Sequence, residues 1–306
     1  MNDTRITDWH LGHILRDAAS GKVTTWDMGG EPVDPGLVDE HQKHANFLLA
    51  LLTDSPYAAL EKCYDEFKHA MAALRSPDSK SGTLPRQVRE TRSRLDNLLS
   101  ALRAFTDRTA HDLKERYGEN SDPVSTFKES LSCEYDNEFA YRFMYKLRNY
   151  SQHCGQPDLS AKAQGGRTEN GEVVRTVSVT FDPVVLLSRF NKWGAHVKGE
   201  LQAMGGEFEA EPIVDSLMAS CGRAYSKTLL TQEGHIQAAS TFIHGHNRAP
   251  HGKAAVPCFF GLNREEWISN GRRNTTVLVV RIDLAILADS ALAAAKEVTT
   301  ESTEGE

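Results

Sequence analysis

The chain has 306 residues, room for about two domains, and its hydrophobic share of 40% rules out small disulfide scaffolds and collagen-like chains. Lysine and arginine number 35 against 42 acidic residues, and the resulting net charge of −7 excludes nonspecific binding of polyanions through bulk positive potential. The longest apolar run, Phe47 to Leu52, is far below the roughly 20 residues of a membrane-spanning helix. We therefore expect a cytoplasmic protein without membrane segments.

The first half of the chain predicts an irregular start followed by helices. Residues 1–36 are rich in glycine and proline and predict an irregular lead-in, with one short helix at 9–19. Helical spacing begins at Leu37 and runs to Leu52. Ser55 and Pro56 predict the capped start of a second helix, which ends at Ser76. A third, long helix is predicted from Leu84 to Tyr117, where Gly118 stops it.

The next segment carries aromatic and aliphatic residues at steps of four and predicts a fourth helix, from Pro123 to about Gly155. A polar loop is predicted over 161–171, a short β element follows it, and Asp182 with Pro183 opens a helix that runs to about Met204. We interpret 37–205 as one helical domain, a bundle of four or five helices with a small β element.

A smaller mixed α/β region is predicted at 206–296. It contains helical segments at 213–230 and 236–243, strands at 255–260 and 276–282, and a final helix at 283–296. Residues 297–306 carry four acids and no base, which predicts a disordered acidic tail. The predicted fold class is therefore mainly α, a helical bundle with a small β element plus a smaller mixed α/β C-terminal region.

The most informative pattern lies at the end of the fourth predicted helix. The chain reads Leu-Arg-Asn-Tyr-Ser-Gln-His, with Arg148, Asn149 and His153 as its polar frame. A chain of this composition contains about one arginine–histidine pair at this spacing by chance, and Arg5 with His10 is such a pair. Requiring an asparagine or aspartate directly after the arginine lowers that expectation about tenfold, and of the two pairs only Arg148 meets the condition, with Asn149.

This string resembles the motif of the HEPN superfamily, which is an arginine, usually a polar residue, three more residues and a histidine. The resemblance covers roughly 37–204, and the string is similar to the version in bacterial HEPN proteins of abortive-infection and toxin–antitoxin systems. It implies a homodimer with two facing motifs and a metal-independent endoribonuclease used in antiviral defence or growth arrest. Some HEPN toxins carry a tyrosine two residues after the histidine as a target of nucleotidylation; Gly155 stands there, so that control is not expected.

The residue types suit RNA cleavage. Imidazole, with an ordinary pKa near 6.5, can take a proton from the ribose 2′-hydroxyl or return one to the leaving oxygen. An arginine fork can bind the phosphate and stabilise the charge that gathers on it. We therefore expect His153, Arg148 and Asn149 to be catalytic, without cofactor or metal. The expected substrate-binding residues are Tyr150, as a base-stacking ring, and Gln152, Lys146 and Arg142.

The third predicted helix adds eight basic residues against five acids, which allows a local positive groove for RNA. The eight are Arg86, Arg89, Arg92, Arg94, Arg103, Arg108, Lys114 and Arg116. The alternative is a solvated helix face with ion pairs between neighbouring turns. Arg148 and His153 likewise have an alternative role, in which they complement the dipole and carbonyls of a helix C-terminus.

Two further alternatives stay open. His244, His246 and His251 lie within eight residues and are candidate metal ligands, although they lack the spacing of a known zinc motif. The chain as a whole is either the nuclease described above or a catalytically silent HEPN-like interaction module whose C-terminal region binds a partner. Besides RNA and a second copy, an antitoxin or regulatory protein is a candidate partner.

Overall fold

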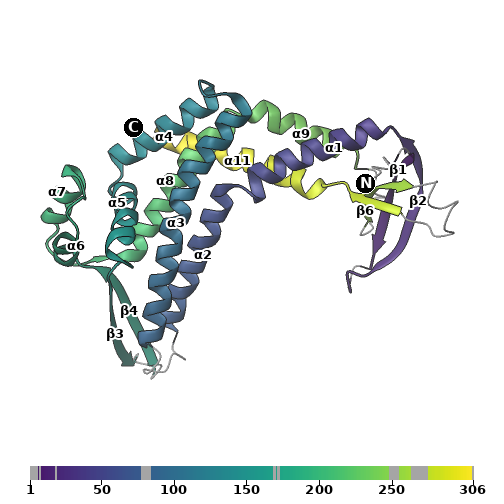
Figure 1. Ribbon diagram of the computed structural model, residues 1–306. Helices are drawn as coiled ribbons and strands as arrows, with labels where there is room; N and C mark the ends of the chain where they lie inside the picture. Colours follow the sequence, from purple (N-terminus) through teal and green to yellow (C-terminus); the bar gives the residue numbers. More distant parts are fainter. Residues whose placement is uncertain are drawn as a thin grey trace. The chain divides into compact units, whose positions relative to one another are not determined.

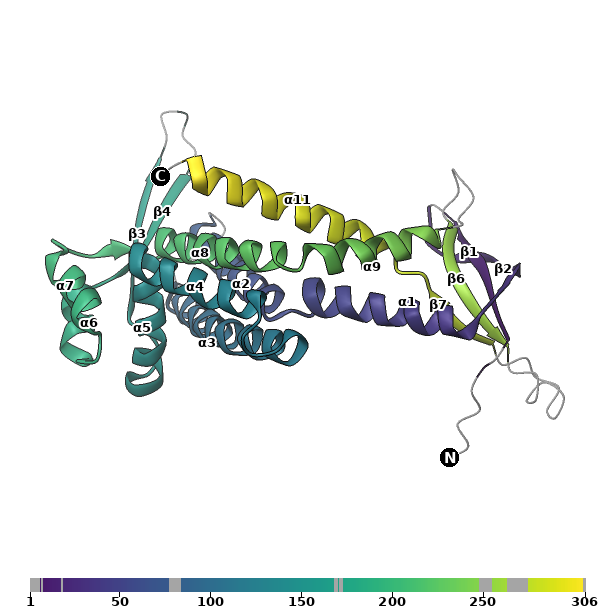
Figure 2. The ribbon, with the colours of Figure 1, turned by 90° about the horizontal axis from the view of Figure 1, so that it is seen from above.

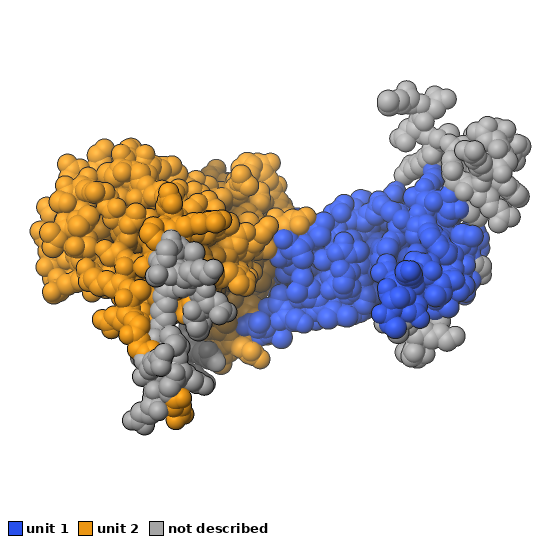
Figure 3. Space-filling model, turned by 90° about the horizontal axis from the view of Figure 1, so that it is seen from below, with its two compact units in different colours: residues 1–53, 232–294 blue, residues 54–231, 295–306 orange. Residues whose placement is uncertain are grey.

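The structure is a computed structural model, and it describes residues 6, 8–17, 19–76, 84–167, 170, 173–247, 255–262 and 275–304. It is mostly helical with two small antiparallel sheets, which confirms the prediction of a mainly α chain (Figures 1 and 2). Two compact units divide it: unit 1 is Met1–Thr53 with Gln232–Ala294, and unit 2 is Asp54–Thr231 with Ala295–Glu306 (Figure 3). Both units are discontinuous, so they do not coincide with the predicted domains 37–205 and 206–296.

Unit 1 combines a four-stranded sheet with helices. The strand order is β2-β1-β6-β7, formed by β1 (Asp8–Arg16), β2 (Val23–Val33), β6 (Ala255–Leu262) and β7 (Thr275–Val279). The helices are α1 (Pro35–Leu48), which continues into a π-helical segment (Leu49–Thr53), α9 (Glu233–Gly245) and most of α11 (Ile282–Glu304). Helices α1 and α9 lie side by side (Figures 1 and 2). The sheet joins to α1 through the buried ring of Phe259, whose centroid is 5.1 Å from that of His41.

The prediction of an irregular lead-in with a helix at 9–19 is wrong, because β1 and β2 form a hairpin there. Strand β1 also pairs with β6, some 250 residues further along the chain, where Gly12 lies opposite Cys258. A Cβ atom on Gly12 would lie 2.1 Å from the carbonyl oxygen of Asp27. The glycine that made this segment look irregular is therefore required by the close approach of two strands.

The predicted disordered tail is also wrong over 297–304, which continue helix α11. No glycine or proline interrupts the sequence from Ile282 to Glu304. The hydroxyl groups of Thr299 and Thr300 donate to backbone carbonyls one turn earlier, at 2.8 Å each. Acidic residues alone do not end a helix, because helix ends are set by caps and breakers.

Unit 2 is a set of packed helices with a three-stranded sheet of order β3-β4-β5. Its helices are α2 (Pro56–Arg75), α3 (Leu84–Tyr117), α4 (Asp122–Asn137), α5 (Phe139–Cys154), α6 (Pro183–Arg189), α7 (Ala195–Ala203) and α8 (Ala210–Leu230). Its strands are β3 (Leu159–Arg167), β4 (Val173–Phe181) and β5 (Phe208–Glu209). The long helices α2 and α3 lie side by side (Figure 1). Local signals predicted both: Ser55 caps α2 through its hydroxyl, and α3 has its predicted bounds.

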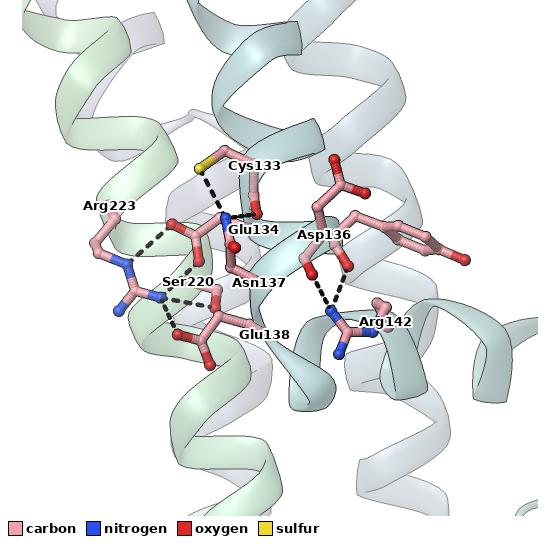
Figure 4. A network of polar contacts seen from close by, with 9 residues as sticks. Cys133, Glu134, Asp136, Asn137, Glu138, Arg142, Ser220 and Arg223 are labelled. Atoms are coloured by element: carbon pink, nitrogen blue, oxygen red, sulfur yellow. Dashed lines mark hydrogen bonds and ion pairs between the residues drawn. The ribbon is translucent and has the colours of Figure 1, made fainter. Parts of the chain in front are cut away.

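The predicted fourth helix is instead two helices, α4 and α5, separated at Glu138. The backbone of Glu138 is extended, with φ −108° and ψ 113°. The guanidinium of Arg142 donates to the carbonyl oxygens of Tyr135 and Asp136 at 2.7 Å each, which satisfies the last turn of α4 (Figure 4). Neither glycine nor proline marks this break, and the apolar spacing of four continues through it, so the sequence pattern misses it.

The region after α5 differs from the prediction in two places. The segment 161–171, predicted as a polar loop, lies largely in β3, which pairs with the correctly predicted strand β4. The helix predicted from Pro183 to Met204 starts as expected, with Asp182 accepting from the amides of Val184 and Val185. It then divides into α6 and α7 before Gly194, whose φ of +81° favours glycine.

Candidate functional site

Helix α5 carries every predicted site residue, and one aromatic face holds it in place. Phe143 and Tyr150 are fully buried on that face. The ring of Trp193 stacks on both, with centroids 5.8 Å from each. The ring of Phe181 from β4 also packs against Phe143, at 5.2 Å. Because this face is committed to the core, the opposite face of the last two turns is turned toward solvent.

The motif residues lie along that outer face. At about 100° per residue, Arg148 and His153 are about 140° apart around the helix axis. Asn149 and Gln152 lie between them; Asn149 is half-buried, and Gln152 and His153 are exposed. Within one chain, the two principal residues of the motif therefore border opposite sides of one exposed helix face.

Arg148 lines a pocket between α5 and α3. Its Nη1 donates to the side-chain oxygen of Asn149 at 3.4 Å. Among the residues that the structure describes, no carboxylate lies within ion-pair distance of its guanidinium. By contrast, Arg142, which lies six residues before Arg148 on the same helix, pairs with Glu200 on α7. A guanidinium held by neutral groups alone keeps its capacity to bind an anion.

His153 lies on the last turn of α5, which ends at Gly155 with φ of +90°. Its imidazole stacks on the ring of Phe190, with centroids 6.3 Å apart and planes 18° apart. In the described part of the chain no hydrogen bond or ion pair occupies its ring nitrogens, and the residue is exposed. The phenyl ring orients the imidazole and leaves both nitrogens accessible for proton transfer.

Two of the remaining predicted substrate-binding residues stay at the surface. Lys146 is half-buried, and its Nζ lies 5.8 Å from the ring centroid of Tyr145 and 6.0 Å from that of Tyr135. Gln152 is exposed. Both positions are compatible with contact to a bound chain, although the aromatic rings already attract the Lys146 ammonium.

Arg142 does not fit the predicted substrate-binding role. Its side chain is 11% exposed, donates to two carbonyl oxygens of α4 and pairs with Glu200 at 2.5 Å. Figure 4 shows its guanidinium directed at the end of α4. These contacts use its donors within the fold, so we assign Arg142 to the packing of α5.

Tyr150 likewise cannot stack on a base. Its ring is fully buried between Phe190 and Trp193, with centroids 5.9 and 5.8 Å away. Burial raises the pKa of Tyr150, against the opposing effect of the Arg189 guanidinium beside its hydroxyl. The tyrosine of the motif is therefore a core residue that anchors the last turn of α5.

The pocket beside Arg148 also contains residues that the motif does not include. It is lined by Leu102, Arg103, Thr106, Tyr145, Arg148 and Asn149. Arg103 belongs to the basic set predicted on the third helix, but nothing in the sequence distinguishes it from its neighbours. Part of this basic set instead forms ion pairs between neighbouring turns on a solvated face, which is the alternative that the sequence left open. Arg94 pairs with Glu90, and Arg103 pairs with Asp107.

The histidine cluster lies in unit 1, away from this helix in sequence. His244 Nε2 lies 3.0 Å from Asp289, and His246 Nδ1 lies 2.8 Å from the carbonyl oxygen of Phe242. His251 lies outside the described residues. Within the described ranges, no three histidine, cysteine, aspartate or glutamate side chains come together as a set of metal ligands.

Comparison of the chain with protein-family models, with curated proteins and with solved structures finds no match. Across the helices that the structure describes, none combines the length and the apolar character needed to cross a membrane.

Proposed function

We propose that the chain is a metal-independent endoribonuclease of the HEPN type, acting as a homodimer in phage defence or in a toxin–antitoxin system. One observation carries this proposal. On a single helix, Arg142 and Tyr150 are occupied by packing contacts, whereas Arg148 and His153 lie at the surface without a carboxylate partner among the described residues. The two side chains that remain available, Arg148 and His153, are the ones that the proposed chemistry needs.

In the proposed reaction the ribose 2′-hydroxyl attacks the adjacent phosphorus. One imidazole takes the hydroxyl proton as the P–O2′ bond forms, and an imidazolium gives a proton to the 5′-oxygen as the P–O5′ bond breaks. Arg148 stabilises the charge on the phosphate oxygens. The products carry a 2′,3′-cyclic phosphate and a 5′-hydroxyl.

The geometry of the helix supports the proposal of a second copy. Each chain supplies one His153, and that residue lies about 140° around α5 from Arg148. Two copies that face each other through the outer face of α5 would place two imidazoles and two guanidiniums around one substrate. The paired arrangement supplies both the base and the acid.

The test is cleavage of single-stranded RNA by the purified chain in the presence of EDTA. We expect His153→Ala and Arg148→Ala each to lose roughly 100-fold or more in rate. His196→Ala and Arg108→Ala are matched controls, because both residues are exposed in unit 2 and lie outside α5. A 2′-deoxyribose at the scissile position should abolish cutting, and DNA should be inert.

Two results would contradict the proposal. Activity that depends on added divalent metal and on His244 and His246, but not on His153, would move the active site to unit 1. A correctly folded wild-type chain without any ribonuclease activity would favour the silent interaction module.

A further inference from the structure

The pocket between α3 and α5 has the composition of an anion site. It is a shallow hollow that is partly open to solvent, and Leu102 is a buried residue in its wall. Two of its six lining residues are arginines, and none of the six is acidic. Like charges drawn together in a hollow repel each other, and a bound anion relieves that repulsion.

The hydrogen bonds that the described residues make within the pocket leave donors available to a ligand. Arg103 Nη1 donates to the hydroxyl oxygen of Tyr145 at 3.4 Å, which leaves the hydroxyl proton available for donation. The Asn149 oxygen accepts from Arg148, which leaves the amide NH₂ group. The pocket therefore offers neutral hydrogen-bond donors besides the two guanidiniums. A phosphodiester has only hydrogen-bond acceptors, so it matches both kinds of donor.

Arg103 is also held in a fixed orientation. Its Nε lies 2.6 Å from the carboxylate of Asp107, one turn further along α3. Asp107 is 51% exposed and does not line the pocket. The ion pair uses one edge of the guanidinium, and the other edge faces Tyr145, so the arginine is oriented before a ligand arrives.

We propose that this pocket is a phosphate-binding subsite for an RNA chain, in which Arg103 binds a phosphate beside the one that Arg148 contacts. The inference rests on the proposed function, since Arg148 belongs to both. RNA is favoured over a free anion because the pocket opens beside the exposed motif face, along which a polymer would continue. Arg103 is thus a substrate-binding residue that lies outside the motif.

The test measures binding separately from cleavage. A short single-stranded RNA, 2′-O-methylated throughout, cannot supply the attacking hydroxyl, and its affinity for the full chain is measured by fluorescence anisotropy across a salt series. We expect Arg103→Ala to weaken binding about tenfold and to reduce the slope of log affinity against log salt by about 0.7, the value for one phosphate contact to a single strand. Arg108→Ala, the same loss of charge on the same helix but about 140° around its axis, should change neither.

A second variant adds a negative charge to the pocket, whereas Arg103→Ala removes a positive one. Thr106→Glu places a carboxylate in the pocket, and we expect a larger loss of affinity than for Arg103→Ala. Circular dichroism and the thermal midpoint check that each variant is folded. The exposed Arg103–Asp107 pair contributes little to stability, so Arg103→Ala should fold normally.

Three outcomes would overturn the subsite. The first is absence of RNA binding by the wild-type chain, and the second is equal affinity of Arg103→Ala and Arg108→Ala. The third is a loss confined to adenosine 5′-monophosphate, with RNA binding unchanged, which would indicate a free-nucleotide pocket. Failure of the wild type to cleave RNA would contradict the proposed function but leave this binding test intact.

Discussion

Two arginines on one helix show how position decides the role of a side chain. Arg142 and Arg148 are six residues apart, which separates them by about 120° around α5. That rotation directs Arg142 to the carbonyls of α4 and to Glu200, and Arg148 to the pocket with Arg103. Residue type and side-chain charge are the same for both. Their burial decides which is available to a substrate.

At the same scale, His41 in unit 1 makes stability depend on pH. It is 2% exposed, and its Nε2 accepts from the backbone amide of Arg281 at 3.4 Å, which requires a neutral ring. Burial, with the nearby charges of His246, His44 and Arg281, lowers the pKa of His41 from 6.5 to about 4. Between these two values the unfolded chain binds a proton that the folded chain does not, so the free energy of unfolding falls as pH falls.

We expect this histidine to remove about 2 kcal/mol of stability between about pH 7.5 and about pH 5. The check is urea unfolding of wild type and His41→Leu across that range, because the variant lacks the titrating group. The wild type should lose stability more steeply than the variant. Parallel pH dependence of the two proteins would show that His41 is not buried as a neutral ring.

At the scale of elements, the orientation of α5 depends on contacts at its first turns. Arg142 bonds α5 to the end of α4 and to α7. On the other side of the same junction, Arg223 on α8 pairs with Glu134 at 2.5 Å and reaches Glu138 at 3.5 Å (Figure 4). Glu134 has a side-chain exposure of 9%. These partly buried pairs hold the ends of α4 and α5 together where a single long helix would otherwise continue.

We expect Arg142→Ala to lower the free energy of unfolding by about 3 kcal/mol, because it leaves two helix carbonyls and Glu200 without their cation. Lys162→Ala breaks an ion pair whose lysine is 64% exposed and should cost less than about 1 kcal/mol. Chemical denaturation of both variants and the wild type measures the difference. An equal, small effect of the two substitutions would contradict the packing role of Arg142.

At the scale of the whole molecule, the proposed reaction requires two copies. The outer face of α5, with Gln152 near its middle, would lie near the two-fold axis, where any added charge is doubled. Light scattering at micromolar concentration should give about twice the chain mass of 33.9 kDa. Gln152→Arg should shift the protein toward monomer and reduce cleavage with it. Gln202→Arg, an exposed glutamine on α7, should do neither. A monomeric wild-type protein with full activity would exclude the paired site.

Local sequence signals determined the features that depend on neighbouring residues. Ser55 and Asp182 predicted the capped starts of α2 and α6, and helical spacing that stops at Gly118 predicted the bounds of α3. The same reasoning placed Arg148 and His153 at the end of an amphipathic helix. A cap or a helical face involves residues within a turn or two, so the chain carries that information in a short window.

Only the tertiary structure decided the features that depend on residues far apart. The hairpin of β1 requires β6, the break at Glu138 requires the return of Arg142 to α4, and Arg103 joins the motif only because α3 packs on α5. The sequence predicts Tyr150 as an accessible ring of the motif, but in the fold Trp193 covers it. These roles arise from contacts between elements. Burial decides which of several chemically equivalent side chains stays accessible, and burial exists only once the elements have packed.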